Sequence, residues 1–133
     1  MRESFCVSSA GLSRAFDFVA SAIRTAGLPD SVGQRISVII DEVCSNMIRH
    51  DTRLSETDKF MLDLTPGQTQ TTLVISDTGA EFDPLINRNS ERREIGGHGI
   101  SIIRGLASDV SYQRKNDQNI LTITLASCLP TQV

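Results

Sequence analysis

Hydrophobic positions in the first part of the chain repeat with the period of an α-helix. Residues 4–8 have the pattern of a short strand, and apolar side chains then recur at intervals of three and four residues across Leu12–Ala26. Gly27 and Pro29 follow, and both residue types end helices. The pattern predicts one strand and then a long amphipathic helix.

A second apolar stripe with the same period extends from Val32 to Met47. Ser31 followed by Gln34 has the spacing of a capping box, which predicts the start of this second helix. The pattern ends near His50. We therefore expect two long helices in succession.

The period changes to two residues in the middle of the chain. Apolar and polar side chains alternate across Phe60–Thr65, and Pro66-Gly67 supplies a turn. A further strand begins near Leu73 and ends at Asp77. These features are typical of a β-hairpin.

A long polar segment separates this hairpin from the last elements. Residues of about 80–98 are charged and broken by proline and glycine, so they predict an irregular loop, which we interpret as a lid. A short helix at Ile100–Leu106 leads to a closing hairpin, with Val110 and Tyr112 on one arm and Ile120–Leu125 on the other.

This order of elements predicts the fold class. Helices followed by consecutive hairpins indicate an α+β two-layer sandwich, with the helices on one face of a mixed, mainly antiparallel sheet. No repeat or low-complexity linker divides the chain, so we expect one domain over residues 1–133. Thr72, Val74, Ser76, Thr122 and Thr124 predict that one sheet face is more polar than the other.

Composition excludes several classes of function. A formal net charge of −3, without a basic cluster, argues against direct nucleic-acid binding. No apolar run is long enough to span a bilayer and the N-terminus lacks a signal-peptide pattern, so we expect a cytoplasmic protein with no membrane association. The three cysteines do not have the spacing of a metal site, so we interpret them as small, buried hydrophobic residues.

Glu42 and Asn46 are the first candidates for chemistry. They lie four residues apart on the second helix, on one side of it and next to its apolar stripe. A half-buried carboxylate is costly unless it is paired, and a hard cation with oxygen ligands is one suitable partner. The alternative is that Glu42 pairs with Arg35, Arg49 or solvent while Asn46 caps a local group.

Asp77 is the second candidate. It ends a strand on the same face as Leu73 and Ile75, and Thr78-Gly79 follow it. At the lip of an apolar pocket its carboxylate could accept a hydrogen bond from an exocyclic amine such as that of adenine. An isolated Asp-x-Gly is otherwise most often a simple turn.

The third candidate is a glycine-rich turn, Gly96-Gly97-His98-Gly99, which opens the short helix. Backbone N–H groups at a helix N-terminus can bind phosphate, and glycines allow it to approach closely. The lysine of a P-loop is absent from this turn. The alternative is a glycine-rich helix entry that serves packing.

Taken together and in this order, the three elements resemble the ATP-binding domain shared by gyrases, histidine kinases and a large chaperone family, the Bergerat fold. Within that group the chain resembles the small anti-sigma-factor serine/threonine kinases of bacterial partner-switching systems. The segment 41–50 resembles their N-box, 77–84 their first glycine box and 96–103 their second. The resemblance covers nearly the whole chain.

The resemblance implies a role for each motif residue. Glu42 would be the general base, Asn46 would ligate Mg²⁺, and Asp77 would read the adenine amino group of ATP. Gly79, Gly97 and Gly99 would line the nucleotide, with His50, His98 and Ile100 as further candidate contacts. Glu81 departs from the family, which usually has a second glycine there, and its side chain could narrow the pocket.

Three functions follow as hypotheses. The first is a regulatory serine/threonine kinase that binds a sigma factor and phosphorylates an anti-sigma-factor antagonist, with a homodimer implied by the family. The second is a nucleotide-gated binding module that sequesters a protein partner without phosphoryl transfer. A detached histidine-kinase catalytic domain is the third, and it is weakened because no helical pair carrying a phosphoacceptor histidine precedes the domain.

Overall fold

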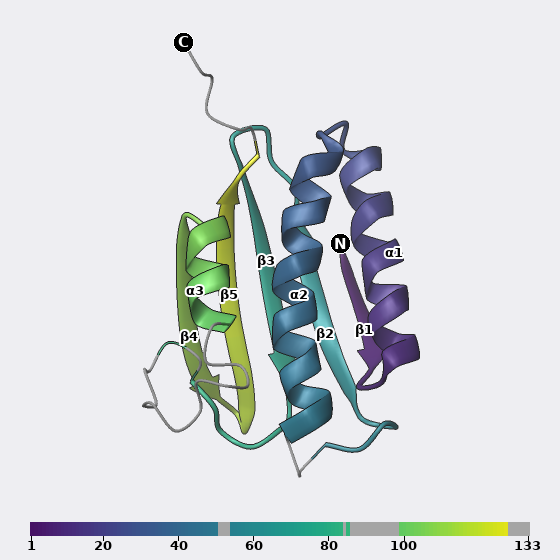
Figure 1. Cartoon of the computed structure of the whole chain (residues 1–133), viewed down its shortest axis with the longest axis vertical. Coiled ribbons are helices and arrows are strands. Elements are labelled where there is room, and N and C mark those ends of the chain that lie inside the picture. The colour runs from purple at the N-terminus through teal and green to yellow at the C-terminus, as the bar shows by residue number, and fades with distance from the viewer. Residues whose placement is uncertain (51–53, 84, 86–98, 128–133) are drawn as a thin grey trace.

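In the part of the chain that the structure describes, three helices lie on one face of a five-stranded sheet (Figure 1). The computed structural model describes residues 1–50, 54–83, 85 and 99–127. The elements are, in order, β1 (Arg2–Cys6), α1 (Ser9–Thr25), α2 (Asp30–His50), β2 (Lys59–Thr65), β3 (Gln70–Asp77), α3 (Gly99–Leu106), β4 (Asp109–Lys115) and β5 (Gln118–Ala126). The predicted α+β sandwich is confirmed.

The sheet has the strand order β1-β2-β3-β5-β4, and every pairing between its described strands is antiparallel. The pairing of β3 with β5 is central, and its register places Asp77 opposite Asn119. These two residues are far apart in the sequence, because α3 and β4 are inserted between the two strands. The sheet therefore brings the end of β3 against the start of β5.

The core lies between the sheet and the helices. Inward-facing strand residues such as Leu62, Leu73 and Ile123 are fully buried, as are Ile36 and Ile39 of α2. Each such side chain stabilises the fold by about 1.5–3 kcal/mol when it leaves water. The opposite sheet face carries the predicted polar set, in which the register pairs Thr72 with Thr124 and Val74 with Thr122.

Several element boundaries differ from the prediction, among them the start of β3, which lies at Gln70 instead of near Leu73. Strand β1 occupies Arg2–Cys6 instead of 4–8, because the Ser8 side chain caps α1 by accepting a hydrogen bond from the Gly11 N–H at 3.0 Å. Helix α2 begins at Asp30, before the predicted cap Ser31, and the Pro29 carbonyl accepts from Val32 N–H in its first turn. Within the described residues, no helix is long and apolar enough to cross a membrane.

Candidate functional site

The two flanks of α2 face different neighbours. On one flank, a side chain at Gly33 would meet Ile23 of α1. On the other, the Arg35 guanidinium reaches β5 and donates to the Ala126 carbonyl at 2.7 Å. At about 100° per residue, Glu42 and Asn46 share the Arg35 flank. Both candidates therefore lie on the side of α2 that faces β5. Figure 1 shows α3 on one side of α2 and α1 on the other.

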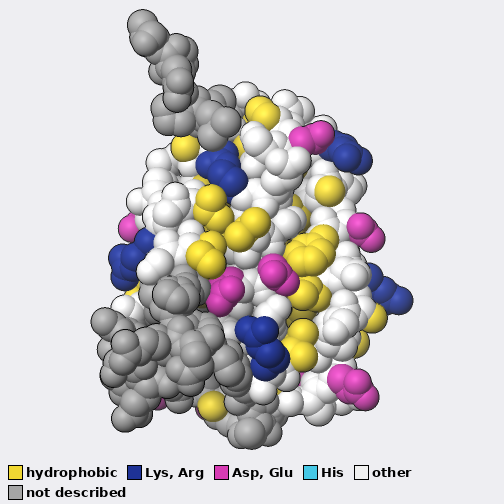
Figure 2. Space-filling view, viewed as in Figure 1, with side chains coloured by type: hydrophobic (Ala, Val, Ile, Leu, Met, Phe, Trp, Pro, Cys, Tyr) yellow, Lys and Arg dark blue, Asp and Glu magenta, His cyan; other side chains and the backbone are white. Residues whose placement is uncertain are grey.

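Glu42 and Asn46 are both half-buried, next to the fully buried Ile39. The Glu42 side chain forms no hydrogen bond or ion pair with any residue in the described ranges, so the expected alternative of a pairing with Arg35 or Arg49 is not observed there. Arg49 instead donates to Asn46 Oδ1 at 3.4 Å. The helical face in Figure 2 carries acidic and basic side chains over the lower half of α2.

Asp77 ends β3 as a buried carboxylate, with 9 % of its surface exposed. Its Oδ1 atom accepts two hydrogen bonds, from the Gly79 backbone N–H at 2.9 Å and from Asn119 Nδ2 at 3.0 Å. The first of these bonds is the Asx turn that Asp-x-Gly favours. Asp77 is thus both a turn residue and a buried acceptor at the end of the sheet.

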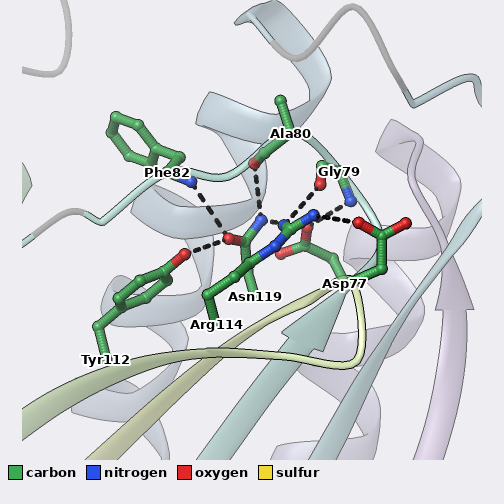
Figure 3. A network of polar contacts seen from close by, with 8 residues as sticks. Asp77, Gly79, Ala80, Phe82, Tyr112, Arg114 and Asn119 are labelled. Carbon is green, nitrogen blue, oxygen red and sulfur yellow. Dashed lines mark hydrogen bonds and ion pairs between the residues drawn. The ribbon is translucent and has the colours of Figure 1, made fainter.

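Asn119 and Arg114 extend this network to the segment that leaves β3 (Figure 3). Asn119 Nδ2 also donates to the Ala80 carbonyl, and its Oδ1 accepts from Phe82 N–H and the Tyr112 hydroxyl. Arg114 donates to the Gly79 carbonyl at 2.9 Å. The β4–β5 hairpin therefore holds the backbone of residues 79–82.

Sequence reasoning did not identify Asn119, Tyr112 or Arg114 as site residues. Burial raises the pKa of the Tyr112 hydroxyl most; the charges of Glu81 and Asp83 raise it further, whereas a hydrogen bond from the Phe82 backbone and the Arg114 charge lower it. The phenol therefore stays protonated and can donate to Asn119 at neutral pH.

Glu81, at the position where the sequence resemblance leads us to expect a glycine, is accommodated without left-handed backbone. Among the described non-glycine residues, only Asn116 and Asp117 have positive φ values. The Glu81 side chain is exposed to solvent. A glycine is therefore not required at this position for the backbone to follow its observed path.

Cys44 lies on α2 between Glu42 and Asn46. The thiol is buried, and burial raises its pKa most, followed by the charges of Asp77 and Asp41. The C-terminal end of α2 and the end of β3 lie at the same end of the sandwich (Figure 1). Glu42, Asn46 and Asp77 thus belong to the same end of the sandwich.

The remaining predicted residues are described less fully. Gly97, His98 and nearly all of the predicted lid beyond Asp83 lie outside the described residues. His50 ends α2, while Gly99 and Ile100 begin α3, and the surroundings of these three residues lie outside what the structure describes. The start of α3 lies at the same end of the molecule as the end of β3 (Figure 1). Helix α3 contacts α2 and β4, with Ile103 buried in the core.

The chain is similar to known proteins in both sequence and structure. The histidine kinase-like ATPase domain family matches residues 7–125. The serine/threonine-protein kinase BtrW of Bordetella bronchiseptica is 28 % identical over 95 residues, which cover 67 % of each protein.

Solved structures share the fold. The structure of the SiaB–SiaC complex from Pseudomonas aeruginosa matches with a TM-score of 0.60 and 10 % identity, covering 95 % of this chain and 89 % of the other. The histidine kinase domain of a blue-light activated histidine kinase from Erythrobacter litoralis matches with a TM-score of 0.51 and 16 % identity, covering 92 % and 61 %. Because the family match spans most of the chain and the fold agrees, the chain belongs to the histidine kinase-like ATPase domain family.

Proposed function

We propose that this ATPase-family domain is a regulatory serine/threonine protein kinase that acts as an anti-sigma factor. It would bind Mg·ATP and phosphorylate an anti-sigma-factor antagonist on a hydroxyl group. The observation that carries the proposal is that Glu42, Asn46 and Asp77 occupy one end of a fold whose relatives include a serine/threonine kinase.

The described residues fit an adenine nucleotide. Asp77 is a buried carboxylate, and a site built to accept a hydrogen bond from a ligand amine rejects a ligand without that donor. The two donors to Oδ1 hold the Asp77 carboxylate in one orientation. Gly79 lies directly beside this carboxylate and would line the nucleotide. In the undescribed part of the chain, Gly97 and His98 are proposed to complete the phosphate side, with Gly99 and Ile100 at the start of α3.

The described residues also fit a magnesium ion carried by the nucleotide. Mg²⁺ is usually held by one or two protein oxygens together with phosphates and water. Asn46 offers such an oxygen, and its present donor, Arg49, is an exposed side chain that can move aside. Within the described ranges no three histidine, cysteine or acidic side chains gather into a metal cage, which a nucleotide-borne ion does not need.

Glu42 has the properties of a proton acceptor. It is half-buried, carries no described hydrogen bond or ion pair, and shares a helix flank with Asn46. Bound magnesium would neutralise phosphate charge, and Glu42 would accept the proton of the attacking serine or threonine hydroxyl. The flank that presents Glu42 faces α3 and β5, where the nucleotide phosphates are expected.

The partners proposed are a sigma factor, which the domain sequesters, and an antagonist protein, which it phosphorylates. A homodimer is proposed from the family resemblance. The SiaB–SiaC complex is the structure of a related fold with a protein partner, and it supports a role in protein association at the level of the fold.

A second candidate is a nucleotide-gated binding module without phosphoryl transfer. The position of Arg49 favours it, because the guanidinium contacts the same Asn46 oxygen that would bind magnesium. The negative charge of Glu81 at the first glycine box adds to this argument.

Two measurements test the proposal. ATP affinity with and without Mg²⁺ comes first, and absence of binding in both conditions would overturn the nucleotide site. The purified domain is then incubated with γ-labelled ATP and candidate antagonists. Label on a serine or threonine of an antagonist supports the kinase, whereas binding without transfer supports the module.

A further inference from the structure

The geometry points to Asn119 as a positioning residue of the nucleotide site. We propose that its side-chain amide orients the Asp77 carboxylate and fixes residues 79–82, so that the β4–β5 hairpin sets the preference for adenine. This inference rests on the proposed binding of a nucleotide at Asp77.

The hydrogen-bonding capacity of Asn119 is fully used. Its Nδ2 donates to Asp77 Oδ1 at 3.0 Å and to the Ala80 carbonyl at 2.9 Å. Its Oδ1 accepts from Phe82 N–H at 3.2 Å and from the Tyr112 hydroxyl at 2.5 Å. An amide has two donors and two acceptor lone pairs, so no capacity is left over. An aspartate at this position would lack both donors.

Packing does not explain an amide at this position. Asn119 faces the core with the same parity as Leu121 and Ile123, and only 7 % of its surface is exposed. A buried polar group costs free energy unless its hydrogen bonds are satisfied. Three of the four bonds of Asn119 go to Asp77 and the segment directly after it. The amide is therefore best explained by the groups that it holds.

A second side chain of the same hairpin supports this role. Arg114 Nη1 donates to the Gly79 carbonyl at 2.9 Å, and Arg114 Nη2 donates to Asp117 Oδ1 at 2.8 Å. Arg114 and Asn119 thus hold the consecutive carbonyls of residues 79 and 80 (Figure 3). The segment that contains Glu81 is thus held by side chains of both strands of the β4–β5 hairpin.

Orientation of the Asp77 carboxylate determines which base it can read. A fixed carboxylate oxygen accepts from the amino group of adenine but repels the carbonyl oxygen that hypoxanthine has at the same position. If the Asn119 amide is lost, the carboxylate keeps its charge but loses one of the two donors that hold Oδ1. Discrimination between the two bases should then fall more than affinity for the shared ribose and phosphates.

The test compares ATP with inosine triphosphate. Dissociation constants for both nucleotides are measured for wild type, Asn119→Ala, Asn119→Asp and the control Gln118→Ala, with chemical unfolding of each free protein. Gln118 is the adjacent residue and is exposed. The bond from Asn119 to the Asp77 carboxylate is charge-assisted, so both Asn119 variants should lower the preference for ATP by about tenfold or more. Gln118→Ala should keep it.

A milder variant covers the case in which both Asn119 variants unfold. Tyr112→Phe removes one hydrogen bond to Asn119 Oδ1 and retains the ring, and it should lower the preference severalfold. An unchanged ratio in the folded variants overturns the positioning role, as does an equal loss of affinity for both nucleotides. Failure of wild type to bind ATP, or to prefer it, overturns the proposed nucleotide site itself.

Discussion

Cys44 of α2 lies close enough to Asp77 at the end of β3 for the carboxylate charge to act on its thiol. Burial raises the pKa of the thiol most, and Asp77 and then Asp41 raise it further. A thiol that stays protonated is a poor nucleophile and a poor metal ligand. Cys44 is therefore a packing residue, and the pKa of its thiol depends on the charge of Asp77.

The raised pKa of Cys44 predicts a loss of stability in alkaline solution. In the unfolded chain the thiol titrates near its ordinary value of 9.0, while the folded chain keeps the proton. The contribution of Cys44 to the free energy of unfolding is fully present below this pH. It falls as pH rises above it, by at most about 1.4 kcal/mol per pH unit. Chemical unfolding at pH 7 and pH 10 should show a smaller loss for Cys44→Ala than for wild type. Equal losses would contradict the prediction.

Asp77→Asn is expected to abolish tight nucleotide binding while the fold is kept. The amide oxygen can still accept from Gly79 N–H and Asn119 Nδ2, but the other atom becomes a donor that opposes the adenine amino group. Loss of a hydrogen bond to a charged group predicts an affinity about 10- to 200-fold lower. Calorimetric titration measures it, with Thr78→Ala, an exposed neighbour, as the control. If Asp77→Asn binds ATP with wild-type affinity, Asp77 serves only the turn that it forms with Gly79.

Glu42→Gln should retain ATP binding and lose phosphoryl transfer. The amide keeps the size of the side chain but cannot accept a proton at neutral pH, and loss of a general base typically costs about 10²–10⁴-fold in rate. Because Glu42 has no described hydrogen bond or ion pair, stability should change by less than about 0.5 kcal/mol. The assay is transfer to an antagonist. Asp41→Asn, which changes an exposed neighbouring carboxylate, should transfer at the wild-type rate.

Asn46→Ala should give a different result from Glu42→Gln. It removes a candidate metal ligand, so ATP affinity should fall in the presence of Mg²⁺ and stay unchanged in its absence. Titrations of ATP with and without Mg²⁺ separate binding through the metal from binding of the nucleotide alone. An equal effect in both conditions would assign Asn46 to the nucleotide instead of the metal.

Two buried glycines predict opposite effects of alanine. A Cβ at Gly11 would lie 1.9 Å from the Cys6 carbonyl oxygen, whereas at Gly33 its nearest contact is Ile23 Cγ1 at 3.6 Å. Gly11→Ala should destabilise by about 3 kcal/mol or more, because backbone must move. Gly33→Ala should stabilise by up to about 1 kcal/mol through helix propensity. Chemical unfolding measures both, and similar values would show that α1 can shift away from β1.

Local periodicity was sufficient to predict much of the fold. The apolar stripe of α2 placed Glu42 and Asn46 at its edge, and alternation placed Asp77 on the inward face of β3; the structure agrees on both points. The errors at Ser8 and Ser31 were errors of capping, because several nearby residues could each have begun a helix. Period alone does not choose between them.

The pairing of Asp77 with Asn119 could not be predicted from one sequence. It depends on the register of β3 with β5 across the intervening helix and strand, and local patterns carry no information on that register. One signal was present: Asn119 interrupts the apolar parity that Leu121, Ile123 and Leu125 continue. A polar residue at an inward-facing position indicates a satisfied network or a site.

The register of β3 with β5 also has a consequence for how such domains diversify. The chain between Asp77 and Asn119 closes one loop, whose ends are joined by the central strand pair. The entropy of closing a loop grows only with the logarithm of its length, so doubling the connection costs about 0.6 kcal/mol. Insertions or deletions between these strands therefore leave the core nearly as stable as before. Related chains can therefore differ in the length of this connection while its two ends stay held by the pairing of β3 with β5.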